Sequence, residues 1–112
     1  MKIQIAIEGK EKYLGKKILL EAFLFAWKNG GQLCDDENVI DDPKHVIVIA
    51  DYTLLHRLEN LLSPWIGGRF LYQESVKIEG ILMGHRKDGF TLALCEVSKC
   101  IVERDGVIYQ VV

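Results

Sequence analysis

The most reactive side chains of this sequence are three cysteines and three histidines: Cys34, Cys95, Cys100, His45, His56 and His85. A thiol becomes a nucleophile when a histidine lies beside it and a third group orients that histidine. No such arrangement is encoded locally, and Cys95 and Cys100 lie in apolar, strand-like segments where free cysteines are usually buried. Cys34 is predicted in an exposed loop, where acidic neighbours raise the pKa of its thiol and make it less reactive. These residues do not predict nucleophilic catalysis.

Metal and nucleotide sites are not predicted either. Five residues of types that can bind metals are close in the sequence: Cys34, Asp35, Asp36, Glu37 and His45. Their spacing is neither that of a zinc finger nor that of an EF-hand loop. No glycine pattern has the spacing of a phosphate-binding loop. We therefore expect no metal and no cofactor, and the sequence leans toward a non-enzymatic protein without deciding the question. A catalytic group that only the fold assembles stays open, because its members need not be close in the sequence.

An acidic segment is the first feature that could bind a partner. Five carboxylates surround Val39 and Ile40 in what the pattern predicts to be an exposed loop: Asp35, Asp36, Glu37, Asp41 and Asp42. Their negative potential could steer a basic protein toward this loop. The plainer interpretation is a solvated loop. We take these five residues as the candidate partner-binding site.

A nucleic-acid interface is the alternative. The net charge of −2 argues against non-specific binding of nucleic acid, but a local surface could still bind RNA. Its candidate phosphate contacts are Arg69, Arg86, Lys87 and Lys99, and its candidate stacking rings are Phe70, Tyr72 and Phe90. The basic turn at residues 85–87 could also touch an acidic protein surface.

The first half of the chain predicts a β-α-β unit. Residues 2–8 alternate between isoleucines and polar residues, which is the period of a half-buried strand. Residues 15–29 are rich in helix formers and are followed by Gly30-Gly31, so we expect a helix with Asn29-Gly30-Gly31 as its C-terminal cap. Residues 45–50 are a β-branched run, typical of a strand buried on both faces.

The second half predicts one helix and a β-meander. Leucines at helical spacing follow Asp51 and Thr53, either of which can cap the helix, and Ser63-Pro64 ends it. About five short strands follow, at residues 69–73, 76–83, 90–97, 100–104 and 107–112. Asp105-Gly106 predicts a two-residue hairpin that pairs Arg104 with Val107 and Val102 with Tyr109. A second hairpin tip is expected at residues 87–89, with a bend or bulge at Gly84.

A partial resemblance accompanies this layout. Residues 76–82 are VKIEGIL, residues 92–94 are LAL and residues 102–107 are VERDGV. These local sequences, and the layout of a helix followed by short strands over residues 58–112, are similar to those of the Sm-like RNA-binding barrels. The resemblance implies a barrel-like fold for this half. The positions where that family contacts RNA hold Phe90-Thr91-Leu92 and Arg104-Asp105-Gly106 instead, so no functional residue is transferred.

Together these patterns predict a single α+β domain over residues 1–112, with the β-α-β unit, the second amphipathic helix and the meander on one core. The N-terminus does not have the pattern of a secretory signal, and the apolar run at residues 18–27 is too short to span a membrane. An odd cysteine count without a CxxC pair favours the cytoplasm. We expect a protein-binding domain, most simply an inhibitor or immunity protein that covers the active surface of a basic toxin or nuclease. Monomer and homodimer both remain open.

Overall fold

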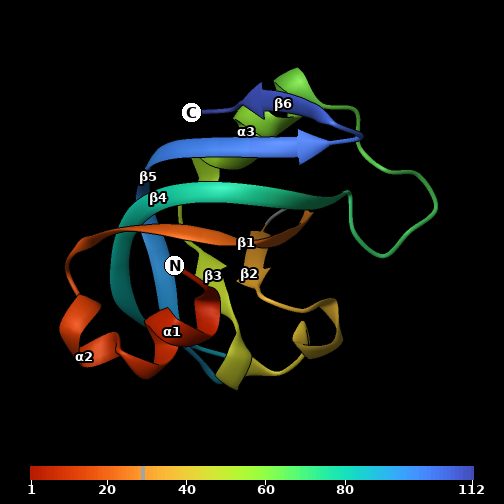
Figure 1. Cartoon of the computed structure of the whole chain (residues 1–112). Helices are drawn as coiled ribbons and strands as arrows, with labels where there is room; N and C mark the ends of the chain where they lie inside the picture. Colours follow the sequence, from red (N-terminus) through yellow and green to blue (C-terminus); the bar gives the residue numbers. More distant parts are fainter. Residues whose placement is uncertain (29) are drawn as a thin grey trace.

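The structure is a computed structural model that describes residues 1–28 and 30–112. It is mostly β, with 49% strand and 23% helix, and its six strands form one sheet in the order β3-β2-β1-β4-β5-β6. Because β3 also pairs with β5, in parallel, five strands close a barrel and β6 extends beyond it (Figure 1). The strands are β1 Lys17–Trp27, β2 Gly30–Cys34, β3 Ile47–Ile49, β4 Tyr72–Lys87, β5 Phe90–Arg104 and β6 Val107–Gln110.

Short helical segments surround the barrel: α1 Ile3–Glu8, α2 Lys10–Tyr13, η1 Glu37–Val39, η2 Pro43–His45 and α3 Tyr52–Leu61. In Figure 1 α1 and α2 lie at the lower left, and α3 lies behind β5 and β6 near the top. Within the described residues α3 is the one helix of seven or more residues. Its N-cap is Asp51, whose carboxylate accepts from the Thr53 amide. The expected second helix is thus confirmed.

The predicted N-terminal β-α-β unit is wrong in both of its first two elements. The expected first strand is α1, in which Ile3 and Ala6, three residues apart, are buried and Ile5 is exposed. The N-terminus of α1 is held from a distance, since the Asp35 carboxylate accepts from the amides of Ile3 and Gln4. A six-residue alternation is too short to exclude a helix that such a tertiary cap stabilises.

The expected first helix is strand β1. Ile18, Leu20, Ala22 and Leu24 point into the barrel, and the residues between them face outward. The period of two was hidden because two outward residues, Leu19 and Phe23, are also apolar. Tertiary pairing with β2 and β4 overrides the helix propensity of this leucine-rich and alanine-rich segment. Asn29, part of the expected helix cap, lies outside the described residues.

The five-strand meander is also wrong, although its turns are confirmed. Two long strands, β4 and β5, cover most of the positions expected for four short ones, and β6 completes the segment. Arg104 pairs with Val107 and Val102 with Tyr109, as the Asp105-Gly106 turn predicts, with positive φ at both turn residues. The hairpin tip at residues 87–89 is confirmed, and the pairing shifts register between Gly84 and Lys87. The implied barrel is therefore built from both halves of the chain, not from residues 58–112 alone.

The long β4–β5 hairpin bends at Gly80, so its two halves lie in different parts of the barrel wall. Its register shifts between Glu79 and Ile81. A Cβ atom on Gly80 would lie 2.8 Å from the Cys95 carbonyl oxygen and 2.9 Å from Leu94 Cγ. Only glycine permits this close approach of the two strands. On β5 the same register shift leaves a bulge between Cys95 and Lys99. Asp51 holds this bulge, because its Oδ2 accepts from the Val97 amide at 2.9 Å.

The core has a main part and a smaller satellite. The main cluster fills the barrel with side chains from β1 through β5, and α1 and α3 pack on it. The satellite lies between the acidic segment and the segment before β4, and consists of Phe25, Cys34, Ile40, Val46 and Phe70. Burial of the apolar acidic-segment residue Ile40 ties this loop to the barrel.

Candidate functional site

The most exposed apolar side chain of the molecule lies in the connection between α3 and β4. We call residues 63–71 the Trp65 loop. Residues 63–69 are all exposed, and Ile66 is 98% exposed while Trp65 is 43% exposed. In Figure 1 this loop projects from the right-hand side of the barrel, beside the turn between β5 and β6. A solvent-exposed isoleucine does not contribute the free energy of burial that normally makes an apolar side chain stabilise the fold.

Backbone hydrogen bonds close the base of this loop. The Trp65 amide donates to the Leu71 carbonyl at 2.8 Å, and the Leu71 amide donates to the Ala26 carbonyl in β1 at 2.9 Å. The Tyr72 hydroxyl, which is buried, donates to the Leu62 carbonyl at 3.1 Å. Both ends of the loop are therefore attached to the barrel within a few residues of its exposed tip.

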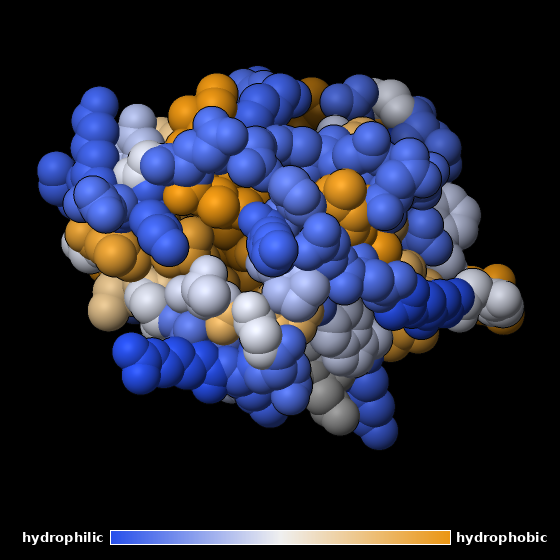
Figure 2. Space-filling model, turned by 90° about the horizontal axis from the view of Figure 1, so that it is seen from below, coloured by the Kyte–Doolittle hydropathy of each residue, from blue (hydrophilic) through white to orange (hydrophobic). Residues whose placement is uncertain are grey.

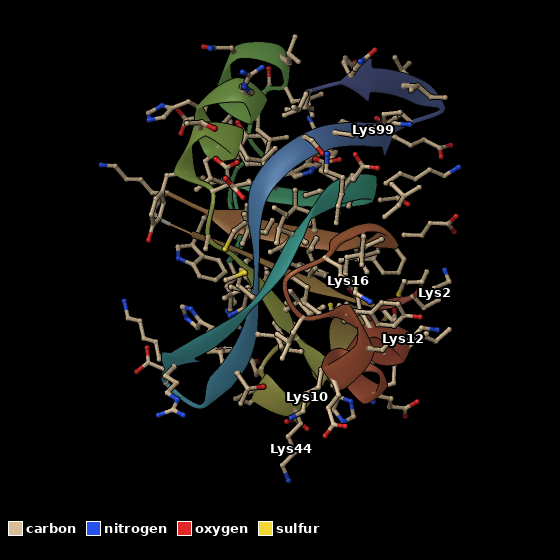
Figure 3. All side chains as sticks on the ribbon, turned by 90° about the vertical axis from the view of Figure 1, so that its left-hand side faces the viewer. Lys2, Lys10, Lys12, Lys16, Lys44 and Lys99 are labelled. Carbon is tan, nitrogen blue, oxygen red and sulfur yellow. The ribbon has the colours of Figure 1, made fainter. Side chains whose placement is uncertain are left out.

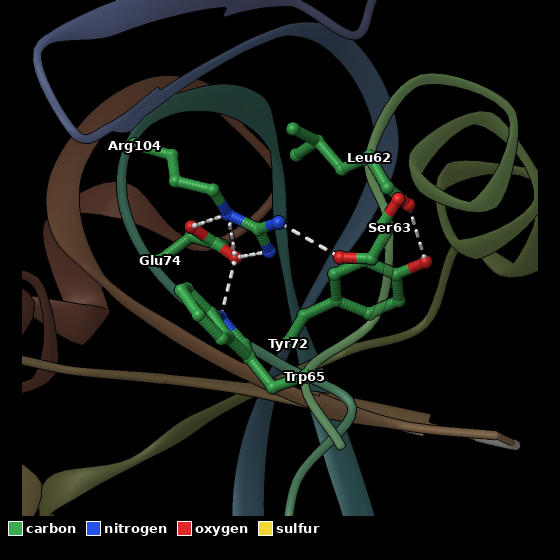
Figure 4. A network of polar contacts seen from close by, with 6 residues as sticks. All are labelled: Leu62, Ser63, Trp65, Tyr72, Glu74 and Arg104. Atoms are coloured by element: carbon green, nitrogen blue, oxygen red, sulfur yellow. Dashed lines mark hydrogen bonds and ion pairs between the residues drawn. The ribbon is translucent and has the colours of Figure 1, made fainter.

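A buried polar network adds a second set of anchors (Figure 4). Residue Glu74 is 3% exposed, and its carboxylate forms an ion pair with Arg104 of β5. It also accepts from Trp65 Nε1 at 3.1 Å, and Arg104 Nη1 donates to the Ser63 carbonyl at 2.7 Å. The Arg104 guanidinium lies 4.4 Å from the centroid of the Trp65 ring. Hydrogen bonding to Glu74 raises the pKa of Arg104 above its usual value.

The network holds charges that would be costly to bury alone. Arg104 Nε donates to both Glu74 oxygens, at 3.0 and 3.1 Å, so the buried carboxylate is satisfied by several donors. Removing one partner of such a buried ion pair strongly destabilises the folded protein. The loop that displays Ile66 therefore starts from a fixed conformation at Trp65, and binding there orders fewer groups than binding to a loose loop.

The Trp65 loop and the acidic segment meet at an ion pair. Arg69 donates to both Asp41 oxygens, at 2.6 and 3.0 Å, with both side chains largely exposed. This hydrogen bond from Arg69 holds the pKa of Asp41 below its ordinary value. The Arg69 guanidinium also lies 4.9 Å from the Phe70 ring centroid, and Phe70 packs edge-on against Phe25. A recess of about 260 Å³ adjoins this contact, lined by Trp27, Gln32, Arg69 and Phe70.

The structure gives four of the five predicted acidic residues a hydrogen-bond partner, which is local for Asp36 and Asp42 and distant in the chain for Asp35 and Asp41. Asp35 caps α1, and Asp36 and Asp42 accept from the amides of Asn38 and Lys44. Asp41 binds Arg69, and Glu37 lies in the first turn of η1. Asp36, Glu37, Asp41 and Asp42 remain exposed while Asp35 is half-buried. The five residues stay a predicted partner site, now attached to the Trp65 loop through Asp41.

The reactive side chains do not assemble into a site. Cys34 is fully buried, not in an exposed loop as expected, and burial, more than its acidic neighbours, raises the pKa of its thiol to about 11. Burial likewise raises the pKa of Cys100 to about 12. His45 Nδ1 lies 2.8 Å from Gln4 Oε1, a contact between η2 and α1. Among residues 1–28 and 30–112, no three histidine, cysteine or carboxylate side chains gather closely enough to hold a metal ion.

The structure brings one part of the RNA alternative together, since Lys87 pairs with the half-buried Phe90 at the β4–β5 hairpin tip, next to Arg86, and it leaves the rest apart. Of the predicted stacking rings, Phe70 and Tyr72 are buried. Figure 3 shows Lys99 near the top of the molecule, far from the hairpin tip that carries Arg86 and Lys87, and the other labelled lysines are spread down the same side. The face seen from below is mainly hydrophilic, with apolar atoms in separate patches (Figure 2). Arg69 already binds Asp41.

Sequence reasoning missed the Trp65 loop because its anchors are far apart in the chain. Trp65, Glu74 and Arg104 are separated by 9 and 30 residues in their hydrogen bonds. One local signal was present: two large apolar residues, Trp65 and Ile66, stand between Pro64 and Gly67-Gly68, where a turn needs only polar or small residues.

Comparison with known proteins adds no family. No protein-family model matches the chain, and no curated protein is similar to it at a significant level. None of the helices in the part of the chain that the structure describes is long and apolar enough to cross a membrane.

Proposed function

We propose that the chain is a non-enzymatic protein-binding domain that acts as an inhibitor or immunity protein, and that the Trp65 loop is the centre of its binding surface. One observation carries the proposal: Ile66 is 98% exposed at the tip of a loop whose base is fixed by the Glu74–Arg104 pair. A protruding apolar residue on a loop with an anchored base suits insertion into a partner's cleft, which is how a small domain covers an active surface.

The surroundings of the loop support a partner with a basic rim. Asp41 joins the loop to the acidic segment, in which the carboxylates of Asp36, Glu37 and Asp42 are also exposed. Apolar residues at the centre of an interface contribute most of its binding energy, and surrounding charges mainly raise the association rate. Ile66 would thus contribute affinity and the acidic segment would contribute steering.

The test is affinity capture with paired variants. The tagged protein, Ile66→Ser and Ile5→Ser are used to capture partners from a nuclease-treated lysate of the source cells, and the eluates are identified by mass spectrometry. Ile5 is 53% exposed on α1, so the control makes the same change on another surface. A stoichiometric protein bound by the wild type and Ile5→Ser, and bound about 10- to 100-fold more weakly by Ile66→Ser, is expected.

The same experiment can overturn the proposal. A partner that binds Ile66→Ser as tightly as the wild type would remove the loop as the binding centre. Recovery of RNA in place of protein would move the RNA alternative to the front. Once a partner is identified, its enzymatic activity is expected to fall as this protein is added in equal amount; unchanged activity in the saturated complex would contradict inhibition.

A further inference from the structure

We propose that a recess at the tip of the β4–β5 hairpin binds single-stranded nucleic acid, with a base against exposed aromatic rings and a backbone phosphate at Lys87. The inference goes beyond the proposed function and does not rest on it, because no lining residue of this recess belongs to the Trp65 loop. It uses Lys87 and Phe90, which the RNA alternative already named, and adds Trp27 and Tyr52 as exposed rings.

The recess has a volume of about 150 Å³ and lies where β2 and β3 meet the tip of the β4–β5 hairpin. We call it the tip recess. Aromatic rings from three elements line it: Trp27 at the end of β1, Tyr52 at the start of α3 and Phe90 at the start of β5. These rings are far apart in the sequence, and closure of the barrel brings them together because β3 pairs with both β2 and β5.

The first argument is that the rings of the tip recess are available for stacking. Tyr52 is 68% exposed and Trp27 is 37% exposed. The Trp27 ring packs over the backbone of Gly30, where an added Cβ would lie 3.1 Å from ring atoms Cε2 and Cζ2. Its centroid is also 6.1 Å from that of Phe70. A ring held in this way loses little conformational freedom when a base stacks on it.

The second argument is charge, which selects a polyanion over a neutral ligand. The tip recess is lined by Lys87 and His85, and Arg86 stands between them on the hairpin. Within residues 1–28 and 30–112, neither Lys87 nor Arg86 takes part in an ion pair. Asp88 is the one carboxylate among the described lining residues, so the two cations of the tip outnumber it. A neutral sugar or an apolar peptide would use the rings but would leave both cations without a complement.

The acidic segment approaches the tip but does not supply that complement. The contact is at Pro43, whose Cγ would lie 3.5 Å from a Cβ on Gly89. The two carboxylates next to Pro43 in the acidic segment are already engaged, since Asp41 binds Arg69 and Asp42 accepts from a backbone amide of η2. They therefore compete with a phosphate for Lys87 less than free carboxylates would.

The third argument selects a polymer over a single nucleotide. The recess of about 260 Å³ beside Arg69 shares Trp27 and Gln32 with the tip recess, so the two adjoin. A chain of nucleotides can place one base in each, with the Gln32 amide able both to donate to a base edge and to accept from it. The bases of a duplex are already stacked and paired, so a single strand is the form that presents its bases to these rings.

The experiment measures binding of fluorescein-labelled oligodeoxyuridylate of about eight nucleotides to the full protein, by fluorescence anisotropy at low salt. An abasic strand with the same phosphates is expected to bind at least about fivefold more weakly, because it cannot stack on the rings. Oligouridylate of the same length is measured beside it, and tighter binding of one strand identifies RNA or DNA as the natural source of the ligand. In ¹⁵N-labelled protein the indole signal of Trp27 is expected to shift more than that of Trp65; Trp27→Phe assigns the two signals.

Paired variants test the ring and the charge separately. Tyr52→Ser is expected to weaken binding of the strand roughly 5- to 100-fold, whereas Leu61→Ser, at the other end of α3, where Leu61 is 48% exposed, is expected to leave it unchanged. Lys87→Gln is expected to lower the slope of log K against log salt by about 0.7, the value of one phosphate contact, and Lys10→Gln on α2 is expected to leave the slope unchanged. Ile66→Ser is also expected to leave strand binding unchanged, so failure of this inference and failure of the proposed function are distinguishable.

Three results would overturn the inference. The first is that neither strand binds at about 0.5 mM protein and low salt, where a Kd of about 0.1 mM would leave more than four-fifths of the strand bound. The second is equal binding of the abasic strand, which would mean that attraction to phosphates alone is responsible. The third is binding of Tyr52→Ser and Lys87→Gln that matches the wild type in affinity and salt slope, which would place the nucleic acid on another surface.

Discussion

Replacement of Arg104 by methionine tests whether the Trp65 loop is held by the buried ion pair. The change removes the charged partner of Glu74, whose side chain is 1% exposed, and also the donor to the Ser63 carbonyl. Breaking a buried pair from one side costs about 3–5 kcal/mol. For a domain of 112 residues this corresponds to a fall in Tm of roughly 12–20 °C. Urea unfolding followed by tryptophan fluorescence measures the cost.

A double-mutant cycle tests most directly whether the Glu74–Arg104 pair stabilises the fold. Arg104→Met with Glu74→Met removes both charges, and a buried pair replaced by apolar residues is close to neutral apart from the donors and acceptors left behind. The cycle is expected to show a coupling of at least about 2 kcal/mol. A cost below about 1 kcal/mol for Arg104→Met, with no coupling, would show that the pair does not hold the loop. Arg69→Met, which removes the exposed pair with Asp41, is the control and is expected to leave the unfolding midpoint nearly unchanged.

Three further predictions follow from the barrel. Gly80→Ala is expected to destabilise the protein by about 1–3 kcal/mol in urea unfolding, because its Cβ meets the Cys95 carbonyl, while Gly84→Ala, with open space around it, is expected to be nearly neutral. Burial opposes ionisation of Asp51, but hydrogen bonds from Thr53 and Val97 leave its pKa below the ordinary 3.8; its stabilisation is therefore complete above that value and is lost as pH falls through the folded pKa. Asp51→Asn should cost about 1 kcal/mol at pH 7 and progressively less near pH 3, and an equal cost at both pH values would contradict the linkage. Ellman's reagent at pH 8 should modify the half-buried Cys95 first, because the other two thiols are buried and their pKa values are raised to about 11 and about 12; mass spectrometry of early samples checks the order.

Local signals predicted the parts of the fold that local chemistry decides. The Asp105-Gly106 turn fixes the pairing of Arg104 with Val107, because two residues with positive φ permit only one hairpin register. The Asp51 cap likewise marks the start of α3. Both features depend on residues within a few positions of one another, so the sequence displays them directly.

The N-terminal third could not be predicted because tertiary pairing decides it. In β1 the outward residues Leu19 and Phe23 are as apolar as the inward ones, which erases the alternation that identifies a strand. In α1 the decisive contact is the Asp35 carboxylate, which is about 30 residues away and caps a helix too short to be stable alone. Neither the strand pairing of β1 nor the Asp35 cap of α1 can be recognised from the local sequence pattern.

The acidic segment shows why charge alone did not locate the candidate site. A run of carboxylates suggests one electrostatic surface, but Asp36 and Asp42 accept from backbone amides two residues ahead and so help to shape the loop, while Asp35 caps α1. Asp41 is the residue that joins the segment to the Trp65 loop, through Arg69. If the exposed carboxylates steer a partner, reversal of Glu37, which holds no backbone cap in the described structure, should slow association without loosening the fold. Reversal of Asp35 would instead act through α1, so the two changes separate steering from folding within one acidic run.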